Sequence, residues 1–212
     1  MARRLPVYLL LDVSGSMNGE PIAAVQNGVQ TMVSALMGDP QALESAYISV
    51  ITFGSKVDQV VPLTELTQFV PPQLSAGGQT EMGHALAYLA ECAEREVVKN
   101  SPEAKGDWKP LVFIMTDGRA TDDVERGLAE FNKRKWGIVV ACGAGSGADM
   151  DMLTKITECV VSLDTADSAS IAAFFKWVSA SVSTSSKSVG SANQELSSID
   201  QLPPPPPEIT IL

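Results

Sequence analysis

The chain has little of several things that define other protein classes. Its 212 residues include one histidine and three cysteines, Cys92, Cys142 and Cys159, with no C-x-x-C spacing. Zinc sites and disulfide frameworks need such residues in close sets, so we expect reduced and mostly buried thiols. No G-x-x-x-x-G-K phosphate loop is present, and no nucleophile elbow accompanies the one histidine, which disfavours nucleotide hydrolysis and serine-type catalysis.

Positive charge is also scarce. Lys and Arg number 15 against 25 Asp and Glu, which leaves a formal net charge of −10. A nucleic acid or an anionic membrane surface would repel such a chain, so neither is an expected partner. No apolar run reaches the roughly 20 residues that span a bilayer, and Asp12 cuts short the run after Arg3-Arg4 before it can act as a signal segment. The composition predicts a soluble, cytoplasmic protein.

What the chain does have is enough apolar sequence for one domain. Its hydrophobic content is 45%, and its length suits a domain of ordinary size with a buried core. From about residue 183 the sequence becomes Ser-rich and then contains five consecutive prolines, 203–207. We predict a domain at 1–182 and a tail at 183–212, with a flexible first half and a stiff polyproline II rod. Residues 208–212 can dock as a strand, on this domain or on a partner, or stay disordered.

Short apolar runs alternate with segments of helical periodicity. Strands are predicted at 7–11, 46–53, 56–63, 111–115, 137–143 and 159–162, and helices at about 20–37, 81–99, 122–135, 149–156 and 168–182. The strand at 56–63 follows its predecessor too closely for a parallel crossover, so it should be an antiparallel edge strand. The pattern predicts an α/β, doubly wound (Rossmann-like) and mostly parallel sheet of about six strands, with one antiparallel edge strand and helices on both faces.

Oxygen-bearing side chains follow two of the predicted strands. Asp12-Val13-Ser14-Gly15-Ser16 comes directly after 7–11, and Asp117 comes soon after 111–115. Thr80 lies at the start of the helix that precedes the second of these strands. Ligands of open α/β sheets bind beyond the carboxyl ends of the strands. If the two strands are neighbours, five side chains converge on one crevice: Asp12, Ser14, Ser16, Thr80 and Asp117.

Two carboxylates and three hydroxyls form a set of hard oxygen donors. Such a set selects Mg²⁺, with Mn²⁺ or Ca²⁺ as alternatives, over zinc or copper. Magnesium takes six ligands in near-octahedral order, so these side chains and water leave one exchangeable position. An Asp or Glu of a protein partner is the natural occupant. His84, one helical turn after Thr80, either borders this cleft or is an ordinary semi-exposed helix residue.

The three motifs together resemble the metal-ion-dependent adhesion site of von Willebrand factor type A domains. They are Asp12-x-Ser14-x-Ser16, Thr80 after Gly77-Gly78, and Thr116-Asp117-Gly118. The resemblance covers roughly residues 5–182 and implies a magnesium-mediated protein-binding domain in which the five side chains are direct or water-mediated ligands. Within this family, Asp-Val-Ser-Gly-Ser-Met after Arg-Leu-Pro is similar to the TerY proteins of bacterial tellurium-resistance operons, which implies stress signalling with kinase or phosphatase partners.

Other interpretations of the same residues stay open. Any one motif alone could serve as a helix cap or a turn. A metal-dependent phosphohydrolase could use Asp12 as its nucleophile, but that chemistry needs a second acid two residues later, where this chain has Ser14. A scaffold whose tail is the binding element is a third possibility. We expect a binding module and no enzyme.

Overall fold

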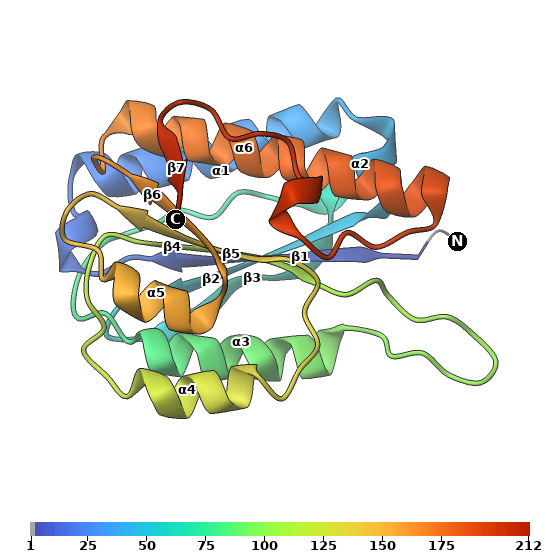
Figure 1. The fold of residues 1–212 in the computed structure, drawn as a ribbon, viewed down its shortest axis with the longest axis horizontal. Helices are drawn as coiled ribbons and strands as arrows, with labels where there is room; N and C mark the ends of the chain where they lie inside the picture. Colours follow the sequence, from blue (N-terminus) through green and yellow to red (C-terminus); the bar gives the residue numbers. More distant parts are fainter. Residues whose placement is uncertain (1–2) are drawn as a thin grey trace.

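A seven-stranded sheet runs through the middle of the protein, between two layers of helices (Figure 1). The computed structural model describes residues 3–212, so the first two residues of the predicted domain lie outside the described residues. The strand order is β3-β2-β1-β4-β5-β6-β7. The strands are β1 (Leu5–Asp12), β2 (Ala46–Phe53), β3 (Val57–Glu65), β4 (Leu111–Thr116), β5 (Val139–Ala144), β6 (Cys159–Leu163) and β7 (Ile209–Ile211).

The sheet is parallel except at its two edges. β2, β1, β4, β5 and β6 pair in parallel, whereas β3 pairs antiparallel with β2 and β7 antiparallel with β6. The predicted doubly wound α/β fold is therefore confirmed. The sheet has one strand and one antiparallel edge more than predicted, because the C-terminal segment joins it.

The helices form two layers that bury opposite faces of the sheet (Figure 1). One layer contains α1 (Glu20–Met37), α2 (Pro40–Ser45) and α6 (Ser168–Lys187), and the other contains α3 (Met82–Glu96), α4 (Val124–Phe131) and α5 (Met150–Ile156). Alternate residues of β1 serve the two cores: Leu9 and Leu11 pack with the first layer, and Tyr8 and Leu10 with the second. Coverage on both faces explains why this strand is a continuous apolar run.

Two helices end earlier than their periodicity predicts. The prediction that α4 reaches residue 135 is wrong, because the helix ends at Phe131. Trp136 stacks on Phe131 with ring centroids 4.6 Å apart, and its indole Nε1 donates to the Phe131 carbonyl at 2.9 Å. This contact turns the chain back to the sheet. α3 ends at Glu96 rather than at 99, since the Val98 amide donates to Asp107 Oδ2 at 2.8 Å.

The last helix continues further than predicted. α6 reaches Lys187 instead of about residue 182, and it passes through the predicted domain boundary without a break. Serine hydroxyls in this helix donate hydrogen bonds to backbone carbonyls one turn earlier. Ser181 donates to the Trp177 carbonyl at 2.8 Å, and Ser185 donates to the Ser181 carbonyl at 2.9 Å. The division into 1–182 and 183–212 stays a prediction, while the C-terminal strand docks on this domain's own edge.

The cysteines and the helices also bear on the compositional predictions. All three cysteines are free, with Cys92 and Cys142 buried and Cys159 partly buried. Burial raises the pKa of the Cys92 thiol, which keeps it protonated near neutral pH. Within residues 3–212, no helix combines the length and the apolar character that a membrane span requires.

Candidate metal centre

The carboxyl ends of β1 and β4 meet at one edge of the sheet. The two strands are neighbours, with Leu11 opposite Met115, so the residues that follow them lie close together. Asp12 ends β1 and is 1% exposed. Its Oδ1 accepts the Ser14 amide at 2.7 Å, and its Oδ2 accepts the Thr116 hydroxyl at 2.5 Å. The carboxylate is thus fixed in orientation by groups that carry no positive charge.

Burial dominates the electrostatics of this carboxylate. It raises the pKa of Asp12 because the charged form loses hydration, and the neighbouring Asp117 raises it further. The hydrogen bonds from Ser14 and Thr116 oppose this effect without cancelling it. A cation at this position would favour the charged form of Asp12.

The turn after β1 connects the two strand ends through hydroxyl groups. Ser14 Oγ lies 3.1 Å from Ser16 Oγ, and Ser16 Oγ donates to Asp117 Oδ1 at 2.6 Å. Ser14 is buried and Ser16 is exposed, so the chain of oxygens leads from the interior to the surface. Ser16 therefore links two other predicted ligands, Ser14 and Asp117, through hydrogen-bonding distances.

Thr80 reaches the same place from a different loop. The Gly77 amide donates to the Val13 carbonyl at 2.7 Å, and the Gly15 amide donates to the Gly78 carbonyl at 3.0 Å, which fastens this loop to the turn after β1. Gly78 has a φ of +82°, and a Cβ there would come within 2.3 Å of Ser55 Oγ, so only glycine suits the position.

Gly118 shows that the Thr80 hydroxyl is close to the other oxygens. A Cβ built on Gly118 would lie 3.7 Å from both Thr80 Oγ1 and Ser16 Oγ. The backbone of Thr80 is held by Thr121, whose hydroxyl accepts the Thr80 amide at 3.2 Å and whose amide donates to the Thr80 carbonyl at 2.9 Å. The structure thus brings all five predicted side chains to one edge of the sheet.

The donor set fits a hard divalent cation. It offers two carboxylates and three hydroxyls, which are the ligand types that Mg²⁺, Mn²⁺ and Ca²⁺ accept. Among residues 3–212, no group of three or more His, Cys, Asp and Glu side chains could hold a metal ion, so a softer site is not formed there. None of the ion pairs within residues 3–212 includes Asp12 or Asp117, so no lysine, arginine or histidine of these residues neutralises the two carboxylates.

Two residues of this region were missed by the sequence analysis as functional candidates. Thr116 was noted only as part of a motif, and Thr121 was not considered. The signal for Thr116 was present, because a polar residue closes an otherwise apolar strand one position before Asp117. The signal for Thr121 was absent, since its contact with Thr80 joins residues 41 positions apart.

His84 behaves as an ordinary residue of α3. It is exposed, its ring Nδ1 lies 3.2 Å from Glu81 Oε2, and its amide donates to Asp122 Oδ2 at 2.7 Å. These contacts support the second of the two interpretations of this residue.

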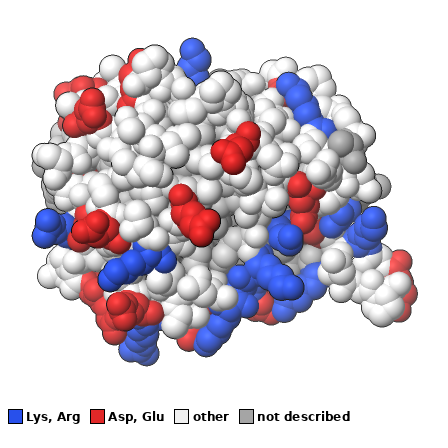
Figure 2. All heavy atoms as spheres, viewed as in Figure 1, with Lys and Arg blue, Asp and Glu red and all other residues white. Residues whose placement is uncertain are grey.

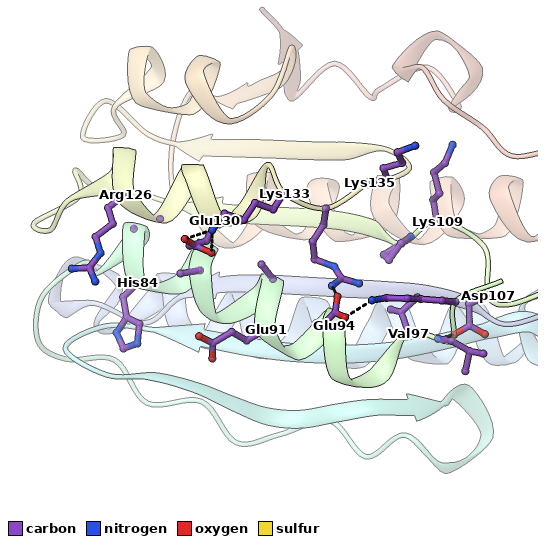
Figure 3. A pocket seen from close by; sticks show the side chains of 18 of the residues that line it. His84, Glu91, Glu94, Val97, Asp107, Lys109, Arg126, Glu130, Lys133 and Lys135 are labelled. Atoms are coloured by element: carbon purple, nitrogen blue, oxygen red, sulfur yellow. Dashed lines mark hydrogen bonds and ion pairs between the residues drawn. The ribbon is translucent and has the colours of Figure 1, made fainter. Parts of the chain in front are cut away.

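A large groove of about 1130 Å³ lies between α3, α4 and the segment 97–110, apart from these five side chains (Figure 3). Several of its charged side chains pair with one another or with nearby residues. Lys133 contacts Glu130 at 2.6 Å, Lys109 contacts Glu195 at 3.0 Å, and Lys99 and Arg134 both contact Glu94. Figure 2 shows the same mixture of acidic and basic groups over this part of the surface. The groove therefore carries acidic and basic groups side by side, whereas Asp12 and Asp117 form no ion pair within residues 3–212.

Comparison with known proteins decides the family. A family model for the von Willebrand factor type A domain matches residues 7–176. The chain belongs to the von Willebrand factor type A (vWA) family. The match includes all five predicted side chains, most of β1 and the whole of β2, β3, β4, β5 and β6. No curated protein matches the chain.

Solved structures share the vWA fold with this chain. Proximal thread matrix protein 1 from the mussel byssus is 21% identical over 84% of this chain and 48% of that one, with a TM-score of 0.63. Another structure of that protein, described as having a zinc-occupied MIDAS motif, is 20% identical over 84% and 48% of the two chains, with a TM-score of 0.61. A vWA protein from Catenulispora acidiphila is 19% identical over 87% and 44%, with a TM-score of 0.64. The vWA chain described here spans less than half the length of each.

Proposed function

We propose that this vWA domain is a metal-dependent protein-interaction module with an intact metal-ion-dependent adhesion site. Asp12, Ser14, Ser16, Thr80 and Asp117 hold one divalent cation, directly or through water, and an Asp or Glu of a protein partner completes its coordination. The observation that supports this proposal most is the chain of oxygens from Ser14 through Ser16 to Asp117. It joins two strand ends, and within residues 3–212 no basic side chain pairs with it.

Each side chain has a distinct role in this proposal. Asp12 and Asp117 supply negative charge, while the three hydroxyls supply neutral oxygens that leave the ion electrophilic. When bound, the cation supplies the positive charge that attracts a partner's carboxylate to an otherwise acidic protein. The zinc-occupied motif of the mussel protein supports a divalent ion, and the hard oxygen donors favour Mg²⁺, with Mn²⁺ or Ca²⁺ as alternatives.

We extend the proposal to a cellular setting through the motif sequence. Asp12 to Met17 after Arg4-Leu5-Pro6 is similar to the TerY proteins, which supports a role in bacterial tellurite resistance or stress signalling, with a kinase or phosphatase as the partner. Three free cysteines suit a reducing, cytoplasmic location.

A phosphohydrolase that uses Asp12 as its nucleophile receives less support. Both carboxylate oxygens of Asp12 already accept hydrogen bonds, and the side chain is 1% exposed. That chemistry also needs a second acid two residues after the nucleophile, and this chain has Ser14 at that position. We therefore propose binding and no enzymatic activity.

Affinity capture with purified protein tests the proposal. Cell extract is passed over wild type in Mg²⁺, over wild type in a chelator, and over Asp12→Asn in Mg²⁺. The matched control is Glu91→Gln, which makes the same charge change on an exposed position of α3. Captured proteins are identified and retested in pure form, with their exposed Asp and Glu residues replaced in turn.

We expect wild type and Glu91→Gln to retain the same partner in Mg²⁺, and the chelator and Asp12→Asn to release it while circular dichroism shows an unchanged fold. Equal capture by Asp12→Asn, or in the chelator, would contradict the proposal. Magnesium-dependent hydrolysis of a generic phosphoester that disappears in Asp12→Asn would favour the enzyme instead.

A further inference from the structure

The five consecutive prolines have no part in the metal centre. Proline fixes its own φ near −65° and confines the preceding residue to extended conformations. Residues 202–206 each precede a proline, and Leu202 has a φ of −82° and a ψ of 161°. We call residues 203–207 the proline strap. These restrictions favour the left-handed polyproline II helix, with three residues per turn, over residues 203–206, and Pro207 begins the turn that leads into β7.

A hydrogen bond from α6 holds the start of the strap, and a turn at its end leads into β7. Trp177 Nε1 of α6 donates to the Pro203 carbonyl at 2.8 Å, and the Ile209 amide donates to the Pro206 carbonyl at 3.0 Å. Leu202 before the strap and Ile209 after it are both buried in the core. In Figure 1 the segment crosses α6 and then descends into β7. The strap is thus a short rod fixed in place before any partner arrives.

One side of this rod faces solvent. Pro204 and Pro207 are exposed, whereas Pro203, Pro205 and Pro206 are partly buried. Because the polyproline II helix repeats every three residues, positions 204 and 207 lie on the same side, about 9 Å apart along the axis. The surface over α6 carries few charged groups (Figure 2). Glu208, directly after the strap, is exposed.

We propose that the proline strap is the docking site of a second protein partner, one whose groove is lined by aromatic side chains. Proline rings at 204 and 207 stack into such a groove, and backbone carbonyls of the strap accept hydrogen bonds from its indole or phenol groups. Prolines have no amide hydrogen, so the strap cannot extend the sheet toward a partner strand. A basic rim on the partner complements Glu208.

The fixed ends of the strap favour this interaction. A flexible peptide loses conformational freedom when it binds, and a rod that is already held loses much less. The strap needs no metal ion, because its contacts involve only rings and carbonyl oxygens. Binding at the strap therefore persists in a chelator, which separates this partner from the one proposed for the metal centre.

The test uses the full chain, in a chelator, and three ¹⁵N-labelled probes: an SH3, a WW and an EVH1 domain, all of which bind polyproline II segments through aromatic grooves. We expect saturable chemical-shift changes in the aromatic groove of at least one probe. Pro204→Ala/Pro207→Ala should weaken that binding at least about tenfold. The matched control, Pro205→Ala, changes a partly buried proline of the same run and should stay within about twofold of wild type.

Thermal unfolding of each variant verifies that the fold persists, and Pro204→Ala alone replaces the double variant if that one unfolds. Three outcomes overturn the proposal. The probes can respond to a free peptide of residues 201–208 but not to the full chain, which would show that the folded chain makes the strap inaccessible. They can respond to neither, or they can bind the double variant as tightly as wild type.

Discussion

Two polar clusters lie at opposite ends of the strands, one at the amino ends and one at the carboxyl ends. Each contains a carboxylate with a buried side chain, but only one of these carboxylates is paired with a basic side chain. At the amino edge, Asp107 accepts Arg4 Nε at 2.9 Å and Arg4 Nη2 at 2.5 Å, together with the Val98 amide at 2.8 Å. At the carboxyl edge, Asp12 accepts one amide and one hydroxyl and has Asp117 as its charged neighbour. The first cluster neutralises its charge internally, and the second does not.

The amino-edge cluster is a fastening between segments. Arg4 Nη2 also donates to the Glu96 carbonyl at 2.8 Å, and the Arg3 guanidinium lies 3.6 Å from the centre of the Trp108 ring. These contacts join the start of β1 to the end of α3 and to the segment before β4. A carboxylate with its own guanidinium is structural, whereas one surrounded by neutral donors is available to an external cation. The comparison shows that a carboxylate's role depends more on whether a basic side chain of the protein neutralises it than on how deeply it is buried. Asp107 is neutralised and joins segments, whereas Asp12 is not and can bind a cation.

The largest expected effect concerns metal affinity. Asp12→Asn keeps the shape of the side chain but removes a negative ligand, so the affinity for Mn²⁺ should fall more than about 100-fold, beyond the loss typical of groups that only support a ligand. Isothermal titration calorimetry or the electron paramagnetic resonance signal of free Mn²⁺ measures this change. Asp107→Asn is the matched control and should bind Mn²⁺ as wild type does. Equal losses in both variants would erase the distinction between the clusters.

The next effect is stabilisation by the ion. A cation that binds only the folded state at 100 times its dissociation constant raises the free energy of unfolding by about 2.7 kcal/mol. Thermal unfolding of wild type and Asp107→Asn should therefore shift upward with Mg²⁺, and that of Asp12→Asn should not. If Mg²⁺ raised the unfolding temperature of Asp12→Asn as much as that of wild type, the ion would have to bind at a site other than Asp12.

The substitution Asp107→Asn tests whether the cluster at the amino ends of the strands stabilises the fold. Asp107→Asn leaves the Arg4 guanidinium without its charge partner, and the Asp107 side chain is only 5% exposed. We expect the free energy of unfolding to fall by about 2 kcal/mol, measured by urea denaturation in a chelator. Asp12→Asn should change it by less than about 1 kcal/mol, because Asn can still accept a hydrogen bond and no longer repels Asp117. A larger loss in Asp12→Asn would reverse the comparison.

The smallest effect concerns a third acid that resembles Asp107. Burial opposes ionisation of Asp39, but hydrogen bonds from Ser183, the amides of Ala42 and Gln41, and Lys187 outweigh it, so its pKa is lowered. The stability that Asp39 contributes is present above its unfolded pKa and is lost as pH falls from about 4 through the lower folded value. Asn can still cap α2, but Asp39→Asn removes the ion pair with the exposed Lys187, so it should reduce stability at pH 7 by about 0.5 kcal/mol and flatten the acid limb of the curve. An unchanged acid limb would show that Asp39 is not neutralised internally.

Much of the fold and the grouping of the candidate metal ligands could be predicted because the signals are local. The apolar runs that became β1 and β4 each end in a polar turn, and their pairing placed Asp12 beside the Asp117 segment. The alternation of strands and helices restricts the order of the sheet, since crossovers between parallel strands are right-handed. The end of α4 was mispredicted because the stacking of Trp136 on Phe131 overrides helical periodicity.

The sequence by itself determined six of the seven strands, most helices and the five candidate oxygen donors, because periodicity and turn chemistry act over a few residues. Only the tertiary structure decided which neutral groups hold those donors, since Thr116 meets Asp12 across 104 positions and Thr121 meets Thr80 across 41. It also decided that the C-terminal residues pair with β6 as β7 and that the proline strap exposes one side. Such contacts depend on the path of the whole chain, which no local pattern specifies.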